Sequence, residues 1–168
     1  DLILKTPGVN LNNINYFIQP QRITSQTELF LYGYNHQVIG VTGTKGKSTT
    51  SSLIYHILSN SRGNTFLAGN IGIPFFDIVD QLDDDSVIVA ELSTHQLEYT
   101  TISPHVAILL NIYQEHLDHF ASLSNYQLAK MNITKYQEES DILIYNAEDE
   151  HIPNLIKSHN YQRRLFKF

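Results

Sequence analysis

The stretch from Gly40 to Leu58, GVTGTKGKSTTSSLIYHIL, places three glycines, two lysines and a Ser-Thr-Thr run between a strand-like and a helix-like segment. Glycines let backbone N–H groups turn inward around phosphate oxygens, and the start of a following helix adds partial positive charge. In that arrangement Lys47 would reach the terminal phosphates of a nucleotide, and Ser48 would offer its hydroxyl to Mg²⁺. The sequence therefore predicts a phosphate-binding loop, although Val41 stands where the strict G-x-x-x-x-G-K-[ST] pattern has its first glycine.

A second candidate is an acidic residue at the end of an apolar run, Glu91 in VIVAELSTHQLE. Enzymes with a phosphate loop hold Mg²⁺ through a carboxylate in such a place, whereas the alternative is a strand-end charge that faces water. Ser93 and His95 suggest a hydrolase at first sight. However, no G-x-S-x-G motif surrounds Ser93, and residues two apart on a helix do not face each other. We therefore expect no nucleophilic serine chemistry.

A third group of polar residues follows another apolar run, in LLNIYQEHLDHF. Its members are Asn111, Glu115, His116, Asp118 and His119. Spacing alone does not select a metal ligand among them, because a helix-capping acid with solvated histidines would give the same pattern.

The elements that must position these residues alternate between strand and helix. Apolar, β-branched runs without polar alternation predict strands buried on both faces of a parallel sheet, at 37–41, 86–92, 105–112 and 141–146. Helices are predicted at 48–60, 74–82, 123–136 and 150–159, the first with one apolar stripe made of Leu53, Ile54, Ile57 and Leu58. This alternation indicates an α/β fold with a doubly wound, mostly parallel sheet, in which ligands bind beyond the carboxyl ends of the strands.

Residues 1–35 differ from the rest of the chain. They contain a short predicted strand, DLILK, a turn, TPGVN, and Asn-rich irregular sequence. We interpret them as the end of a preceding domain with a linker, and 36–168 as the domain that carries the phosphate loop. Because the chain begins with Asp1 and closes on RRLFKF, which reads as a strand with nothing after it, we expect a piece of a longer protein, truncated on its C-terminal side.

The composition limits the class of protein. Hydrophobic residues make up 42% of the 168 residues and charged residues 17%, which is typical of a packed globular domain. The absence of cysteine excludes disulfides and Cys-ligated zinc, and the net charge of −6 gives no reason to expect nucleic acid as a partner. No apolar run approaches the roughly 18 residues of a membrane span, and the N-terminus lacks a signal-peptide pattern. We therefore expect a cytoplasmic protein without membrane insertion.

Taken together, the motifs resemble the Mur ligases, a family of ATP-dependent amide-forming enzymes of peptidoglycan precursor synthesis. The resemblance spans 38–150, and the stretches that carry it are TGTKGKST, GNIGIP, ELSTHQLE, NIYQEHLDHF, YQLAKMNI and YNAEDE. GNIGIP followed by ELSTHQLE is most similar to the branch that adds D-glutamate to UDP-N-acetylmuramoyl-L-alanine. The N-terminal DLILKTPGVN is similar to the end of the family's first, UDP-binding domain, and 36–168 to an incomplete central ATP-binding domain.

The resemblance implies a role for each matching position. The residues implied to wrap the ATP phosphates are Gly43, Thr44, Lys45, Gly46, Lys47, Ser48 and Thr49. Two Mg²⁺ sites are implied, with Ser48 and Glu91 at one and His116 at the second. The family lysine that CO₂ converts into a metal-ligating carbamate corresponds to Lys130, which is implied to be catalytic together with Lys47 and His116.

Substrate contacts are implied at Asn70, Ser93 and Gln96, which would touch the UDP-sugar-peptide. This sequence departs from the branch where His95 replaces a Phe, Thr94 a Ser and Glu115 a common Asp. None of these changes removes a charge or a ligand, so they affect substrate detail rather than the class of reaction.

The implied reaction passes the γ-phosphate of ATP to a substrate carboxylate, after which the amine of D-glutamate attacks the acyl phosphate. The alternatives are a related Mur or folylpolyglutamate-type ligase with another substrate, a plain P-loop kinase or NTPase, and a non-catalytic nucleotide-binding relative. The family's adenine contacts and its amino-acid-binding C-terminal domain would lie past Phe168. We therefore expect residues 1–168 alone to form no amide product.

Overall fold

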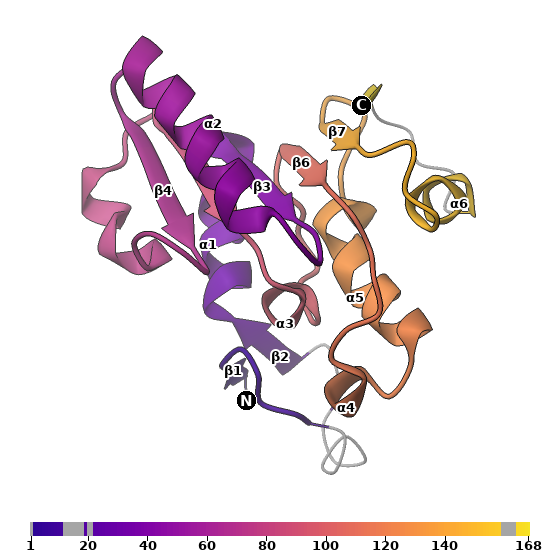
Figure 1. Cartoon of the computed structure of the whole chain (residues 1–168). Helices are drawn as coiled ribbons and strands as arrows, with labels where there is room; N and C mark the ends of the chain where they lie inside the picture. Colours follow the sequence, from indigo (N-terminus) through magenta and orange to yellow (C-terminus); the bar gives the residue numbers. More distant parts are fainter. Residues whose placement is uncertain (1, 12–18, 20–21, 159–163) are drawn as a thin grey trace.

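The computed structural model describes residues 2–11, 19, 22–158 and 164–168 (Figure 1). Its centre is a six-stranded parallel sheet in the order β4-β5-β3-β6-β7-β8. The strands are β3 (Val38–Thr42), β4 (Thr65–Gly69), β5 (Val87–Glu91), β6 (Val106–Leu109), β7 (Ile142–Tyr145) and β8 (Arg164–Lys167). The predicted α/β class and parallel sheet are confirmed. One strand, β4, was not predicted, because its five residues end in Ala68 and Gly69 and lack a sustained β-branched run.

Helices cover both faces of the sheet, as the doubly wound prediction requires. They are α1 (Gln26–Tyr34), α2 (Lys47–Ser61), α3 (Thr94–Leu97), α4 (Leu117–Phe120), α5 (Leu123–Lys135) and α6 (Ile152–Ser158). The larger apolar core lies between the sheet and the helices α1, α3, α5 and α6, which cover one of its faces. The smaller core lies beneath α2 on the opposite face (Figure 1). No helix among the described residues is long and apolar enough to cross a membrane.

The apolar stripe predicted for α2 was half wrong. Ile54 and Leu58 pack on the sheet, but Leu53 and Ile57 are each 56% exposed. The buried side of the helix contains Ser51, Ile54 and Leu58, which are spaced by three and four residues. Leu53 and Ile57 therefore face solvent.

The helix predicted at 74–82 was also wrong. The structure has two single 3₁₀ turns there, Phe75–Asp77 and Val79–Gln81, entered from an extended Pro74. Phe75 and Ile78 are both buried, and their spacing of three matches the period of a 3₁₀ helix. The segment therefore follows two buried anchors rather than one continuous helical stripe.

The N-terminal region is more regular than predicted where the structure describes it. The predicted strand at its start is present as β1 (Ile3–Lys5), which pairs in parallel with an unpredicted strand, β2 (Ile23–Ser25). The unpredicted helix α1 starts where the Ser25 hydroxyl accepts the Glu28 N–H at 3.1 Å, which is a typical N-cap. Phe30 then stacks on Phe75 with ring centroids 4.5 Å apart, so α1 packs into the main core. The domain boundary at residue 35 stays a prediction.

Gly40 in β3 provides a stability test of this packing. A Cβ at Gly40 would lie 2.7 Å from Cγ of Pro104 and 3.1 Å from Cδ1 of Leu92, and a proline ring cannot move aside easily. We expect Gly40→Ala to lower the free energy of unfolding by about 1–3 kcal/mol through overpacking. The matched control is Gly33→Ala in α1, where no atom lies within 4 Å and the change should be stabilising by up to about 1 kcal/mol. Urea unfolding monitored by circular dichroism measures both changes, and an unchanged midpoint for Gly40→Ala would contradict the packing described.

Candidate active site

The carboxyl ends of the central strands bring the predicted polar residues to one edge of the sheet. Val41 in β3 pairs with Glu91 in β5, and Glu91 pairs in turn with Gly69 in β4. On the other side, Thr42 pairs with Leu109, directly before the polar segment that follows β6. The phosphate loop, Glu91 and the segment containing His116 therefore lie at the carboxyl ends of three neighbouring strands.

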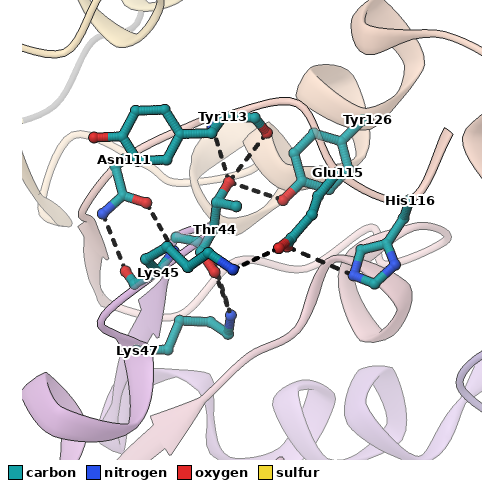
Figure 2. Close-up of polar contacts among 9 residues, drawn as sticks. Thr44, Lys45, Lys47, Asn111, Tyr113, Glu115, His116 and Tyr126 are labelled. Carbon is teal, nitrogen blue, oxygen red and sulfur yellow. Dashed lines mark hydrogen bonds and ion pairs between the residues drawn. The ribbon is translucent and has the colours of Figure 1, made fainter.

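The phosphate loop turns directly from β3 into α2. Gly46 is the N-cap of α2 and has a φ of +83°, in the left-handed region that favours glycine. Lys47, the first residue of α2, folds back so that its Nζ donates to the carbonyl oxygens of Gly43 at 3.0 Å and Thr44 at 3.2 Å (Figure 2). The ammonium group thus lies against the concave side of the loop, where it could meet phosphate oxygens.

Asn111, which follows β6, holds the backbone of the loop at three points. Its side-chain oxygen accepts the Lys45 N–H at 2.8 Å, and its Nδ2 donates to the Lys45 carbonyl at 3.0 Å (Figure 2). Its own carbonyl accepts the Thr44 N–H at 3.0 Å. Asn111 was one of five polar residues that the sequence pointed to, but its role in shaping the loop was missed, because that role depends on β6 lying beside β3.

Thr44 is tied to helix α5 and to the segment after β6. Its hydroxyl lies 2.9 Å from the hydroxyl of Tyr126 and accepts the Tyr113 N–H at 2.9 Å (Figure 2). Tyr126 is fully buried, so this hydrogen bond satisfies a phenol that would otherwise be unpaired in the core. Sequence reasoning did not find Tyr126, since a tyrosine on the buried side of a helix is typical of a core residue.

Lys45, in the phosphate loop, forms an ion pair with Glu115 in the segment that follows β6. Its Nζ lies 2.7 Å from Oε1 of Glu115, and Oε2 of Glu115 lies 3.7 Å from Nε2 of His116 (Figure 2). The hydrogen bond with Glu115 raises the pKa of Lys45, and the same hydrogen bond lowers the pKa of Glu115. Both side chains contact solvent, so the pair contributes little to stability but places two opposite charges beside the phosphate loop.

Glu91 is the clearest candidate metal ligand. Its side chain is 1% exposed, and Oε1 accepts a hydrogen bond from Nδ2 of Asn70 at 2.7 Å. The second oxygen, Oε2, is buried and has no hydrogen-bond partner among the described residues. An unpaired buried carboxylate oxygen is costly unless a cation or donor meets it. Together with the hydroxyl of Ser48 at the start of α2, this donor chemistry fits Mg²⁺.

The described residues contain no cluster of three His, Asp or Glu side chains arranged to enclose a metal ion. Mg²⁺ does not require one, because it usually takes one or two carboxylates and completes its coordination with water and substrate phosphates. The fit of this edge to Mg²⁺ therefore depends on Glu91 rather than on a closed protein cage.

A cavity of about 360 Å³ joins the phosphate loop to the predicted substrate residues. It is lined by Pro7, Gly8, Lys47, Asn70, Ser93, His95 and His116. Burial is the main cause of a lowered pKa at His95, which favours the neutral ring. Gln96 is not among the lining residues. Its Oε1 instead accepts the Ser93 N–H at 2.9 Å in a capping box that starts α3, so the observed contact of Gln96 positions Ser93.

Lys130 lies on α5 and is 1% exposed, although it is a lysine. Its Nζ is 4.9 Å from the centroid of the Tyr126 ring, and no carboxylate forms an ion pair with it among the described residues. Burial lowers the pKa of Lys130 to about 7, with a further contribution from the charge of Lys47. A substantial fraction of the amine is therefore neutral near neutral pH, which is the form that reacts with CO₂.

Comparison with known proteins matches residues 41–168 to the Mur ligase middle domain. That range covers more than half of the chain. The chain belongs to the Mur ligase family.

Individual relatives agree with this Mur ligase assignment. The chain is 40% identical over 162 residues to a UDP-N-acetylmuramoylalanine--D-glutamate ligase of Oceanobacillus iheyensis, covering 94% of this chain and 36% of that protein. The ligase of the same name from Clostridium kluyveri is 38% identical over 153 residues, covering 89% and 33%. The crystal structure of MurF ligase from Thermotoga maritima in complex with ADP superposes with a TM-score of 0.61 at 25% identity, covering 99% of this chain and 41% of that one. The chain thus spans about a third of the length of the two sequence relatives.

The buried Lys130 amine predicts a specific dependence of stability on pH. Because its pKa is about 7 in the folded protein and 10.5 is the ordinary value, the unfolded chain binds more protons between these two values. Stability should therefore rise with pH in this window, by at most about 1.4 kcal/mol per pH unit from this group. In urea unfolding without CO₂, we expect the free energy of unfolding of wild type to increase relative to that of Lys130→Met from about pH 7.5 to about pH 9.5. The exposed Lys135→Met is the control, and parallel curves for wild type and Lys130→Met would contradict a lowered pKa.

Proposed function

We propose that this chain carries the ATP-binding part of an ATP-dependent ligase that adds D-glutamate to UDP-N-acetylmuramoyl-L-alanine, a step of peptidoglycan precursor synthesis. The whole enzyme acts in the cytoplasm on small molecules, with ATP, the UDP-linked peptide and the amino acid as substrates. The two relatives that bear the D-glutamate ligase name support this branch over the others. The MurF structure in complex with ADP supports an adenine nucleotide as a ligand of this fold.

The observation that carries the proposal is the opposition of the phosphate loop and Glu91. The loop supplies the Lys47 ammonium and the start of helix α2, while Glu91 supplies a buried carboxylate oxygen without a partner among the described residues. A nucleotide triphosphate with its Mg²⁺ satisfies both, because phosphates meet the loop and the cation meets the carboxylate.

In this proposal the residues of the loop bind and orient the nucleotide. Gly43 to Thr49 surround the phosphates, and Lys47 exchanges its contacts with loop carbonyls for contacts with the terminal phosphates. Ser48 and Glu91 hold one Mg²⁺, and His116 belongs to the second site. When bound, Mg²⁺ supplies charge neutralisation between the phosphates and the substrate carboxylate.

A free carboxylate does not react with an amine to form a peptide bond because its oxygen is a poor leaving group. Attack of the carboxylate oxygen on the γ-phosphorus breaks the bond to the bridging oxygen and releases ADP, giving an acyl phosphate. The amine of D-glutamate then attacks the carbonyl carbon, loses a proton and expels phosphate. Asn70 and Ser93, which line the cavity beside Lys47, hold the UDP-linked substrate so that its carboxylate faces the γ-phosphate.

Lys130 contributes as a carbamate. The neutral amine attacks CO₂ and loses a proton, which converts it into a carbamate, an oxygen-donating anion that suits Mg²⁺. The buried position of Lys130, its lowered pKa and the absence of a carboxylate ion pair among the described residues support this assignment.

The function is tested with the full-length enzyme by following phosphate release. We expect release only when ATP, UDP-N-acetylmuramoyl-L-alanine and D-glutamate are all present, with one amide formed per phosphate. Release that needs ATP alone would identify a plain NTPase instead. Release with another amino acid or acceptor would identify a different ligase of the family.

Lys47 and Glu91 should fail in different ways. We expect Lys47→Ala in the full-length enzyme to reduce turnover by about 100-fold or more, because the developing phosphate charge loses its fixed cation. Glu91→Gln should instead raise the Mg²⁺ concentration needed for half-maximal rate. Steady-state rates measured against Mg²⁺ separate the two, with the exposed Glu139→Gln as control. An unchanged Mg²⁺ requirement in Glu91→Gln would show that Glu91 is not a ligand.

Lys130 is tested by chemical rescue. We expect Lys130→Ala to fold and to lose most activity, and acetate or formate to restore part of it by placing a carboxylate where the carbamate stood. Rates with increasing acetate, compared with equal concentrations of chloride, measure the rescue. A fully active Lys130→Ala enzyme would contradict the carbamate assignment.

A further inference from the structure

Lys5, Glu98 and His119 form a buried polar cluster that has no role in the function proposed above. Nζ of Lys5 lies 3.2 Å from Oε2 of Glu98, and Nε2 of His119 lies 3.0 Å from the same oxygen. The side chains are 3%, 16% and 8% exposed, respectively.

The three residues come from three segments that are far apart in the sequence. Lys5 ends β1, where its backbone is paired with Ser25, and its ammonium also lies 5.3 Å from the ring centroid of Tyr99. Glu98 is the C-cap of α3, and His119 lies in α4. A single carboxylate oxygen therefore ties the N-terminal strand to two short helices.

Both short helices carry residues of the candidate active site. Ser93 is the N-cap of α3, which contains His95. His116 is the N-cap of α4; its φ is +54°, and its carbonyl accepts the His119 N–H at 3.1 Å. The His95 ring stands between the other two histidines, with centroids 5.0 Å from His116 and 4.5 Å from His119. A shift of His119 would therefore reach His116 both through the backbone of α4 and through the His95 ring.

We propose that the Lys5–Glu98–His119 cluster is a positioning device for the active site. Glu98 fixes His119, His119 and His95 fix the His116 ring, and Lys5 makes this arrangement depend on the N-terminal strand β1. Pro7 and Gly8, just after β1, line the same cavity as His116, so the strand that carries Lys5 also forms part of the proposed substrate site. The role assigned to His116 rests on the proposed function, whereas the mechanical link to His116 does not.

The mechanical link is tested first on this chain without metal or substrate. Long-range ¹H–¹⁵N spectra of the imidazole rings report the surroundings of each histidine separately. In Glu98→Gln we expect the resonances of His95 and His116 to shift as well as those of His119. The matched control is Asp141→Asn, which removes the carboxylate from another histidine pair, His105–Asp141 at 2.7 Å, located at the amino ends of β6 and β7. That change should shift His105 and leave His95 and His116 in place.

The functional consequence is tested in the full-length enzyme. We expect Glu98→Gln to raise the Mg²⁺ concentration for half-maximal rate by about tenfold or more, as is typical when a residue behind a metal ligand is lost. Lys5→Met should also raise this Mg²⁺ concentration. Lys5→Arg should leave it near the wild-type value, because arginine keeps the charge. Lys135→Met, which removes another lysine that lies over a tyrosine ring, should have no effect.

A merely structural ion pair would give a different result. It would lower the unfolding temperature of Glu98→Gln but leave the His95 and His116 resonances and the Mg²⁺ requirement at wild-type values, and that result would overturn the proposal. If the full-length enzyme proves to have no ligase activity, the proposed function fails, and the imidazole spectra alone decide the positioning role. If Glu98→Gln does not fold, the comparison of Lys5→Met with Lys5→Arg decides it by the same two measurements.

Discussion

The position of β3 between β5 and β6 is the constraint on which the site depends. Because all three strands are parallel, their carboxyl ends deliver the phosphate loop, Glu91 and the Asn111–His116 segment to one edge without long connections. Asn111 converts this adjacency into a fixed loop shape, since it accepts the N–H groups of Thr44 and Lys45 and donates to the Lys45 carbonyl. Any slip of β6 against β3 would remove these contacts and move His116 at the same time.

The electrostatics of this edge differ from those of the chain as a whole. The net charge is −6, yet Lys45, Lys47 and Lys130 gather around the loop. The surroundings of the three lysines differ. Lys45 is paired with Glu115, Lys47 donates hydrogen bonds to carbonyls of the loop, and Lys130 is buried with a lowered pKa. In the proposed function, the local site, rather than the overall charge, attracts and orients the anionic nucleotide.

The sequence was sufficient for the features that are local and periodic. The buried strands, the phosphate loop and the helix beginning at Lys47 follow from apolar runs, glycine spacing and the GKST motif, and all are present. The features that it missed depend on contacts across the fold. Strand β2 depends on pairing with β1, and helix α1 packs Phe30 on Phe75. The two 3₁₀ turns replace a helix because their two buried residues, Phe75 and Ile78, are spaced by three. Tyr126, Asn111 and the Lys5–Glu98–His119 cluster became recognisable only when the topology brought their partners together.

We propose that the edge formed by the loop, Glu91 and Lys130 activates a carboxylate as an acyl phosphate. This proposal is tested most directly with UDP-N-acetylmuramoyl-L-alanine labelled with ¹⁸O in both oxygens of its carboxylate. If the full-length enzyme forms an acyl phosphate, mass spectrometry will find one ¹⁸O in each phosphate released and one retained in the amide. Phosphate that contains no ¹⁸O would mean that water, rather than the substrate carboxylate, attacks the γ-phosphate. That result would exclude an acyl phosphate.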